Sequence, residues 1–369
     1  MALVVQKYGG SSVATPEQIR DLARRIVARH EAGDKVVVVV SAMGKSTDAL
    51  VRQAHELAEH PDPREMDMLV SAGERISIAM MSIAINGIRP GLAVSFTGSQ
   101  IGLITDCNHG DARVLEIRGD RLRQALDEGR IAVVAGFQGV STAREITTLG
   151  RGGSDTTAVA VAAALQADVC EIYSDVDGVY TSDPRLAPSA RRLDTVDYET
   201  MLEMSAAGAK VLKDDAVEYA RRLGVRIAAG SSSSGRIGTI VSSENLNRET
   251  LQSMVYYDRL RWIAFGAGVP LPPDCRLCQS IEGRTVVVVD EKHAAAMEGV
   301  PCVSLSLIGS RVAAQRERVN AVLGMLEEAG NRVLAISSAA SKYEIFLEDP
   351  LPQPVVAAIH DALFTAAGQ

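Results

Sequence analysis

The sequence has little of what marks a disulfide-bonded or zinc-stabilised protein. Its five cysteines are scattered and odd in number, which argues against a disulfide framework. Cys275 and Cys278 form a close pair, but no second Cys or His pair stands at ligand spacing to complete the four ligands of a structural zinc. We therefore interpret these cysteines as structural thiols and predict no metal held by the protein itself.

Basic runs and long apolar runs are also absent. The chain of 369 residues has a formal net charge of −8, whereas a nucleic-acid partner would demand a Lys/Arg-rich face. We find no charged-then-apolar leader at the start, and no run approaches the roughly 20 apolar residues of a membrane span. We expect a cytoplasmic enzyme acting on small molecules, with no nucleic-acid or membrane partner.

The hydrophobic content, 47% of the residues, is enough to bury one large core and a smaller one. Residues 1–245 alternate short β-branched runs with longer periodic segments, which is typical of strands joined by crossover helices. Several runs are apolar throughout, as in parallel strands covered on both faces. This pattern predicts an α/β fold. The expected strands are Leu3–Gln6, Val36–Val40, Ala93–Thr97, Ile131–Ala135, Val169–Tyr173 and Val225–Ala228, and the expected helices are Thr15–His30, Ser154–Leu165 and Asp214–Leu223.

A second region, residues 246–369, begins after a serine-rich stretch that reads as loop. Within it, residues 302–364 predict strand, helix, strand, strand, helix, which is most of a ferredoxin-like module of the kind that pairs with copies of itself. Earlier, Trp262–Phe265 and Thr285–Asp290 predict strands separated by prolines, with no convincing helix.

Glycines and hydroxyls follow the first expected strand, in Lys7-Tyr8-Gly9-Gly10-Ser11-Ser12. Backbone N–H groups next to glycine can approach phosphate oxygens, a helix N-terminus favours negative charge, and Lys7 adds a full positive charge. We interpret the stretch as an anion site; an ordinary strand-to-helix turn is the alternative. Gly44-Lys45-Ser46 is not a P-loop, because that motif needs a glycine at position 39, which is valine.

Two further clusters combine glycine with charge. Thr147 to Thr157 places Arg151 and Asp155 around three glycines before an apolar helical run. An arginine in such a turn suits two-pronged capture of a carboxylate, while Asp155 could also be a plain helix-terminus charge. Ser174 to Arg185 carries three carboxylates and an arginine after a strand, and its alternative interpretation is a solvated turn.

Five motifs in order resemble one family. They are Lys7–Val13 (KYGGSSV), Ser41–Thr47 (SAMGKST), Ser71–Glu74 (SAGE), Thr148–Asp155 (TLGRGGSD) and Ser174–Arg185 (SDVDGVYTSDPR). Together they resemble the aspartokinases of the amino-acid kinase superfamily. The resemblance implies a catalytic domain with a mostly parallel central sheet over residues 1–245, followed by a regulatory and dimerising ACT-type region whose first module is shortened.

The same resemblance implies a reaction and a set of site residues. ATP, with Mg²⁺, would phosphorylate the side-chain carboxylate of L-aspartate to give 4-phospho-L-aspartate, the first step toward lysine, threonine and methionine. Lys7 and Asp155 would be catalytic. The nucleotide would be bound by Lys7, Gly9, Gly10, Ser174, Asp175, Tyr180, Arg185, Lys210 and Val211. Aspartate would be bound by Ser41, Thr47, Glu74, Arg151, Gly152 and Ser154.

The chain departs from the family pattern after Gly208-Ala209-Lys210-Val211-Leu212, where Lys213-Asp214-Asp215 replaces the usual His-Pro-Arg. This departure and the shortened first module favour one alternative, a non-catalytic sensor that kept the fold. A second alternative is a kinase for another amino-acid carboxylate. A homodimer through the ACT-type region and lysine or threonine as effector are expected partners.

Overall fold

The computed structural model describes residues 1–150, 152–209, 211–244, 250–266, 271–272, 275–281, 284–294, 297–310 and 312–364. It forms two compact units. The first comprises Met1–Val179, Asp194–Met201 and Val211–Leu246. The second comprises Tyr180–Leu193, Leu202–Lys210 and Asn247–Gln369, so the chain passes between the units several times and not once near residue 245.

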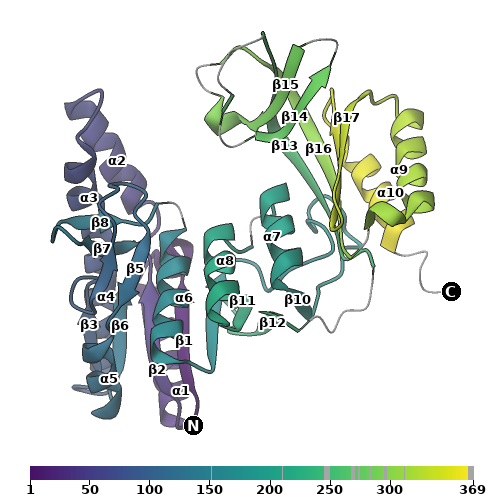
Figure 1. The fold of residues 1–369 in the computed structure, drawn as a ribbon. Helices are drawn as coiled ribbons and strands as arrows, with labels where there is room; N and C mark the ends of the chain where they lie inside the picture. Colours follow the sequence, from purple (N-terminus) through teal and green to yellow (C-terminus); the bar gives the residue numbers. More distant parts are fainter. Residues whose placement is uncertain are drawn as a thin grey trace. The chain divides into compact units, whose positions relative to one another are not determined.

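The first unit is built on an eight-stranded sheet with the order β10-β12-β11-β9-β1-β2-β6-β3 (Figure 1). All its neighbouring strands are parallel except β11 and β12. Its strands are β1 (Leu3–Tyr8), β2 (Lys35–Val40), β3 (Ala93–Phe96), β6 (Ile131–Ala135), β9 (Val169–Ser174), β10 (Thr195–Asp197), β11 (Ile227–Ser231) and β12 (Ile237–Ser242).

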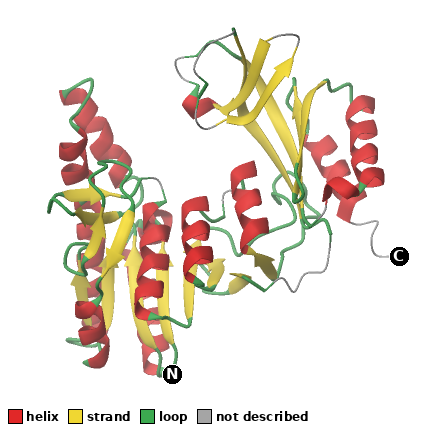
Figure 2. Ribbon diagram, in the orientation of Figure 1, coloured by secondary structure: helices red, strands yellow, loops and turns green. Residues whose placement is uncertain are grey.

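Helices cover both faces of this sheet, as Figure 2 shows. The helices that lie wholly in this unit are η1 (Gly10–Val13), α1 (Pro16–Glu31), α2 (Ser46–Leu57), α3 (Pro63–Val70), α4 (Ala72–Ile88), α5 (Asp120–Asp127), α6 (Gly153–Leu165) and α8 (Asp214–Leu223). The helix α7 (Tyr198–Ala207) has residues in both units. One core cluster joins α1 and α4 to alternate residues of β2, namely Val36, Val38 and Val40. The intervening Val37 and Val39 are also fully buried, and α5 and α6 contact β2 as well, so the all-valine strand is explained by burial on both faces.

The start of α1 shows how local sequence sets these elements. Thr15 accepts a hydrogen bond from the backbone of Gln18, and the Gln18 side chain accepts one from the backbone of Thr15. Pro16 occupies the first helical position, where its missing N–H costs nothing. The predicted helix is confirmed.

A small sheet with the order β5-β4-β7-β8 adjoins these elements in the first unit. Its strands are β4 (Leu103–Thr105), β5 (Val114–Ile117), β7 (Gln138–Ser141) and β8 (Ile146–Thr148). With three or four residues each, the strands are too short to give a clear alternation pattern, and the sequence did not predict them.

The helices α3 and α4 adjoin at Ser71, and together they form a helical stretch, Pro63–Ile88, that is long and apolar enough to cross a membrane by composition alone. Half of its most apolar window is buried, and α4 contacts α1, β3 and β6. Ile78, Met81 and Ile85 of α4 belong to the core of the first unit. The apolar composition of α4 is thus accounted for by packing within this unit.

The second unit has a six-stranded sheet with the order β14-β15-β13-β16-β18-β17, in which every neighbouring pair is antiparallel. Its core lies between this sheet and two helices. The elements are β13 (Ser253–Phe265), β14 (Cys275–Ile281), β15 (Arg284–Asp290), η2 (Glu291–His293), β16 (Val300–Ile308), η3 (Val312–Ala314), α9 (Arg316–Glu328), β17 (Val333–Ser338), β18 (Lys342–Leu347) and α10 (Gln353–Phe364).

The predicted strand-helix-strand-strand-helix order of residues 302–364 is confirmed by β16, α9, β17, β18 and α10. Among the described residues between 250 and 300, the only helix is the single 3-10 turn η2. The antiparallel sheet fits an ACT-type region, and a shortened first module stays a prediction. The sequence missed β14, which contains the Cys275 and Cys278 pair.

Candidate functional site

The candidate site lies at the carboxyl ends of the central parallel strands. β1 is flanked by β2 and β9, so the segments that follow these three strands share one edge of the sheet. This edge is where parallel α/β sheets bind ligands. The N–H of Ser41, after β2, donates to the carbonyl of Tyr8 in β1 at 3.1 Å. The first, second and fifth sequence motifs therefore begin side by side.

Lys7 and Asp155 form a buried ion pair at this edge. Lys7 Nζ lies 2.6 Å from Asp155 Oδ1, and the two side chains are only 11% and 10% exposed. Asp155 is in the first turn of α6, where a negative charge is favourable. Because β1 and α6 are both rigid elements, they hold the lysine ammonium in one place beside the glycine-rich turn.

The turn after β1 has the properties of an anion site. A side chain at position 10 could not fit, because a Cβ there would lie 2.7 Å from the carbonyl oxygen of Ala42. At Gly9 the nearest atom to such a Cβ would be Lys7 Nζ, at 3.5 Å. The hydroxyl of Ser12 is buried and has no hydrogen-bond partner among the described residues. A buried polar atom without a partner costs free energy, and a phosphate oxygen would satisfy it, so these residues fit a nucleotide phosphate.

Glu74 is a buried carboxyl group in the first turn of α4, with only 3% of its surface exposed. Its Oε1 accepts the N–H of Ala42 at 3.0 Å, while Oε2 is buried and has no hydrogen-bond partner among the described residues. Burial raises the pKa of Glu74 to about 7, against the lowering effect of two backbone hydrogen bonds. The site therefore holds an acceptor that lacks a cation.

Replacing Glu74 with glutamine is expected to change how stability depends on pH. Because its folded-state pKa is raised, Glu74 binds its proton more tightly in the folded protein, so its stabilising contribution is present at low pH and is lost as pH rises from about 4.5 to about 7. One pKa unit corresponds to about 1.4 kcal/mol. Across this pH range the free energy of unfolding of the wild type should therefore fall by on the order of 3 kcal/mol more than that of Glu74→Gln. The unpaired N–H of the glutamine also lowers the stability of the variant, but this penalty does not vary with pH. Urea denaturation of both proteins at about pH 5 and about pH 8 measures the difference; parallel pH profiles would contradict the assigned pKa.

Two of the remaining substrate candidates are joined through their hydroxyls. Ser41 Oγ donates to Ser154 Oγ at 3.0 Å. A Cβ on Gly73, next to Glu74, would come within 3.7 Å of Thr47 Oγ1. The structure thus brings Ser41 to Ser154 and places Thr47 near the residue before Glu74, and a shared substrate pocket for these four residues stays a prediction.

Two predicted site residues, Arg151 and Lys210, lie outside the described residues. Gly152 is described, has φ of +83°, and serves as the N-cap of α6. A Cβ at Gly152 would meet Lys213 Cγ at 2.3 Å. The unusual Lys213 thus covers this glycine with its aliphatic stem, while Asp214 and Asp215 occupy the first turn of α8, where acids are favourable.

The fifth motif, Ser174–Arg185, is divided between the two units. Ser174 ends β9 in the first unit, where its hydroxyl accepts the N–H of Val176 at 3.3 Å, and Asp175 follows it. Val211 also belongs to the first unit. Tyr180 and Arg185 belong to the second unit. There the backbone of Tyr180 forms an isolated antiparallel β-bridge with Arg192. The exposed Arg185 forms an ion pair with Asp183 at 2.7 Å. The five-motif pattern gave no sign of this division.

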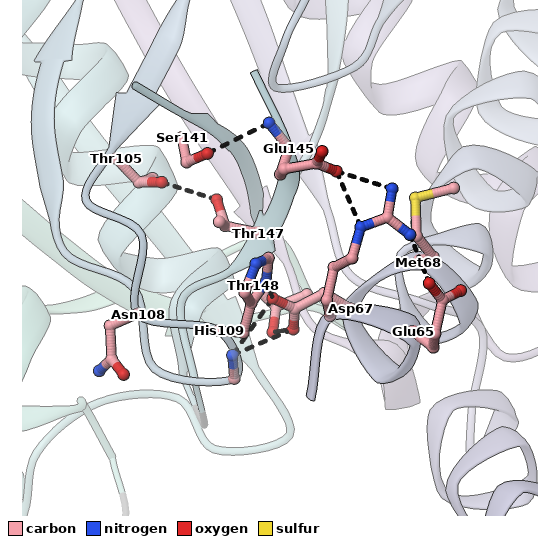
Figure 3. A network of polar contacts seen from close by, with 12 residues as sticks. Glu65, Asp67, Met68, Thr105, Asn108, His109, Ser141, Glu145, Thr147 and Thr148 are labelled. Atoms are coloured by element: carbon pink, nitrogen blue, oxygen red, sulfur yellow. Dashed lines mark hydrogen bonds and ion pairs between the residues drawn. The ribbon is translucent and has the colours of Figure 1, made fainter. Parts of the chain in front are cut away.

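Sequence reasoning also missed a polar network around Asp67 in α3, which Figure 3 shows. Asp67 is 1% exposed and contacts His109, Gly110 and Thr148. One signal in the sequence could have indicated this network: an acidic residue lies within the apolar stretch Met66-Asp67-Met68-Leu69-Val70. A charge that is buried in such a stretch needs polar partners.

A family model described as the amino acid kinase family matches residues 2–228 of the chain. Curated relatives that carry the name aspartokinase include those of Mycolicibacterium smegmatis, 57% identical over 277 residues, and Pseudomonas aeruginosa, 50% identical over 256 residues. These matches cover 74% and 69% of this chain but 66% and 62% of the relatives. The chain thus spans less than two thirds of the relatives' length.

Solved structures give the same picture. Aspartate kinase from Synechocystis is 36% identical, with a TM-score of 0.61, covering all of this chain and 70% of that one. The fold is also that of E. coli aspartokinase III in complex with aspartate and ADP, at a TM-score of 0.82 and 23% identity, over 98% of this chain and 100% of that chain. The motifs, the buried lysine and glutamate at one sheet edge, and these matches agree: the chain belongs to the amino acid kinase family and, within it, to the aspartokinases.

Proposed function

We propose that the protein transfers the γ-phosphoryl group of ATP to the side-chain carboxylate of L-aspartate, giving 4-phospho-L-aspartate. The observation that carries this proposal is Glu74, a buried carboxyl group whose Oε2 has no hydrogen-bond partner among the described residues. An amino-acid ammonium group is the cation that would complete it, since a buried charge is tolerated only when paired. The relatives named aspartokinase support aspartate as that amino acid.

Aspartate carries one cation and two anions, and the proposed site has a charged group for the ammonium and one for the α-carboxylate. Glu74 would receive the ammonium. Arg151, with Gly152 and Ser154, would hold the α-carboxylate, while Ser41 and Thr47 complete the pocket. The reacting side-chain carboxylate would then face the nucleotide.

The nucleotide would lie along the turn after β1, with its phosphates on Lys7, Gly9 and Gly10. The further residues proposed for it are Ser174, Asp175, Tyr180, Arg185, Lys210 and Val211. ADP is bound in the E. coli structure of the same fold. When bound to the phosphates, Mg²⁺ would neutralise part of their charge; no protein ligand is proposed for it.

The acceptor carboxylate is ionised at neutral pH, so the reaction needs no strong general base. Catalysis then reduces to positioning and to neutralising charge on the transferred group. Lys7 supplies that positive charge from a fixed position. Asp155 orients Lys7 through the 2.6 Å ion pair and is a positioning residue in this scheme.

Replacing Arg151 with lysine is expected to raise the KM for aspartate about 10- to 100-fold with little change in the KM for ATP. A lysine cannot reproduce the two parallel hydrogen bonds of a guanidinium to a carboxylate. Steady-state kinetics with each substrate varied in turn would measure the two constants. Arg144→Lys, at an exposed position between β7 and β8, is the control. Equal aspartate KM values for the two variants would remove Arg151 from the site.

Regulation and assembly are proposed from the second unit and its relatives. E. coli aspartokinase III has also been solved in complex with lysine and aspartate, so we propose lysine as an effector, with threonine as the competing candidate. We further propose a homodimer through residues 246–369 and a cytoplasmic location.

The proposed function is tested by a coupled ADP-release assay with ATP, Mg²⁺ and a panel of amino acids, each with and without lysine or threonine. Turnover is expected with aspartate and not with glutamate, whose side chain is one methylene longer. Turnover that is faster with another amino acid, or none with any, would overturn the proposal.

A further inference from the structure

Asp67 is a fully buried carboxyl group that the proposed reaction does not use. It accepts hydrogen bonds from three separate groups: Thr148 Oγ1 at 2.5 Å, His109 Nδ1 at 2.7 Å and the N–H of Gly110 at 3.1 Å (Figure 3). The contact with His109 requires its proton on Nδ1, because a carboxylate only accepts. Burying a carboxylate costs several kcal/mol unless its oxygens are satisfied, and here three donors satisfy them.

One side of this network fixes the glycine-rich turn that follows β8. Thr148 is the last residue of β8, and its carbonyl accepts the N–H of Ala112 at 2.8 Å. Two residues on, Gly150 has φ of +69°, and a Cβ there would lie 2.6 Å from Asp111 Oδ1. The turn is therefore packed directly against the loop that carries His109 and Gly110, and Asp67 holds both.

The other side of the network leads to Glu74. Asp67 is on α3, which meets α4 at Ser71, three residues before Glu74. The Ser71 carbonyl accepts a hydrogen bond from Gln138 Nε2 at 2.8 Å, which attaches this helix junction to the same small sheet that contains β8. The Lys7–Asp155 pair is held by different elements, β1 and α6.

We propose that Asp67, through Thr148 and His109, is a positioning residue for the amino-acid substrate. It sets the separation between Glu74, which receives the ammonium, and the glycines after β8, Gly150 and Gly152, beside which the α-carboxylate is received. This inference rests on the proposed function. Because the network touches the amino-acid side of the site and not the lysine that faces the phosphates, losing it raises the KM for aspartate and leaves the KM for ATP unchanged.

Adjacent threonines of β8 provide a matched pair of variants. Thr147 and Thr148 are both buried, and each makes one side-chain hydrogen bond to another side chain: Thr147 to Thr105 at 2.7 Å, and Thr148 to Asp67. Thr→Val is nearly isosteric, so Thr147→Val and Thr148→Val each remove one buried hydroxyl from the same strand. Thr148→Ser keeps the donor and tests for rescue.

The experiment measures the KM for aspartate and for ATP, the melting temperature, and hydrogen exchange of the backbone amides in residues 147–155. Thr148→Val is expected to raise the aspartate KM at least ten-fold, with the ATP KM within two-fold, and to speed exchange in the turn. Thr147→Val is expected to lower the melting temperature to a similar extent with both KM values within two-fold. Thr148→Ser should restore the wild-type aspartate KM.

A second pair guards against misfolding of the strand variants. The side chain of His109 is 20% exposed. An asparagine at this position can place its amide N–H where Nδ1 of the histidine lies, so His109→Asn should be close to wild type. His109→Ala lacks this donor and should behave as Thr148→Val.

Three outcomes separate the claims. If hydrogen exchange in the turn is unchanged in both Thr148→Val and His109→Ala, Asp67 does not hold the turn in place, whatever the substrate is. Faster exchange with an unchanged aspartate KM, or equal effects of Thr147→Val and Thr148→Val, shows that Asp67 acts in stability alone and overturns the positioning role. Failure of the wild type to use aspartate overturns the proposed function itself.

Discussion

Replacing Lys7 with alanine is expected to lower kcat about 10³-fold while weakening ATP binding only several-fold. Lys7 holds a buried ammonium 2.6 Å from Asp155 at the edge where the phosphates would lie. A fixed charge that meets the charge developing in the transition state contributes about 3–4 kcal/mol to catalysis, more than to ground-state binding. Single-turnover kinetics would measure the chemical step, and calorimetry with ADP would measure nucleotide binding.

The control for Lys7→Ala is Lys35→Ala, which removes a lysine from the other, amino-terminal end of a neighbouring strand. Lys35 pairs with the exposed Asp127 at 2.9 Å, and its loss should leave kcat unchanged. A Lys7→Ala protein with wild-type kcat would remove Lys7 from the catalytic step, and a loss of ADP affinity with kcat unchanged would make it a binding residue only.

Replacing Glu74 with glutamine is expected to raise the KM for aspartate by about two orders of magnitude and to remove its dependence on pH. A neutral amide cannot pair with the ammonium, and loss of one partner from a buried charge pair costs about 3–5 kcal/mol. In the wild type the pKa of Glu74 is about 7 because of burial. Below that pH the group is protonated and must ionise to bind the ammonium, so the KM should rise about ten-fold for each pH unit below 7.

The measurement is the aspartate KM at saturating ATP between about pH 5.5 and about pH 8.5. Titration of the nucleotide is common to wild type and variant, so the ratio of their KM values isolates Glu74. Glu65→Gln, at an exposed acid on α3, is the matched control. A wild-type KM that is flat below pH 7, or a parallel slope in Glu74→Gln, would show that Glu74 does not receive the ammonium.

The sequence predicts the central fold well because its elements carry their own signals. The strand Ile131–Ala135 and the helix Asp214–Leu223 are confirmed at both ends, since one is a pure apolar run and the other an amphipathic stretch ended by Gly224. The expected strand Val225–Ala228 is β11, but it begins at Ile227. Val225 and Arg226 lie between that glycine and the strand, outside any helix or strand.

Elements whose stability comes from a pairing partner escaped prediction. β14 is polar on much of its length and becomes a strand by pairing with the valine-rich β15. The short strands of the small sheet likewise gain stability from their neighbours and from buried pairs such as Thr105 and Thr147. Such pairings depend on tertiary context more than on local propensity.

The candidate site divides in the same way. Lys7, Glu74 and Asp155 stand in motifs that can be recognised along the chain, and the structure adds the ion pair and the unsatisfied glutamate oxygen. Asp67 could not be assigned a partner from the sequence, because His109 and Thr148 are 42 and 81 residues away. Its role follows only from the three donors that meet it.

The central claim is that a carboxylate of aspartate accepts the phosphoryl group, and hydroxylamine trapping tests it most directly. Acyl phosphates react with hydroxylamine to give hydroxamates, whereas phosphate esters do not. With ATP, Mg²⁺ and aspartate, the protein should form aspartate β-hydroxamate in a one-to-one ratio with released ADP. ADP release without hydroxamate, or hydroxamate formed from a different amino acid in preference to aspartate, would contradict the account.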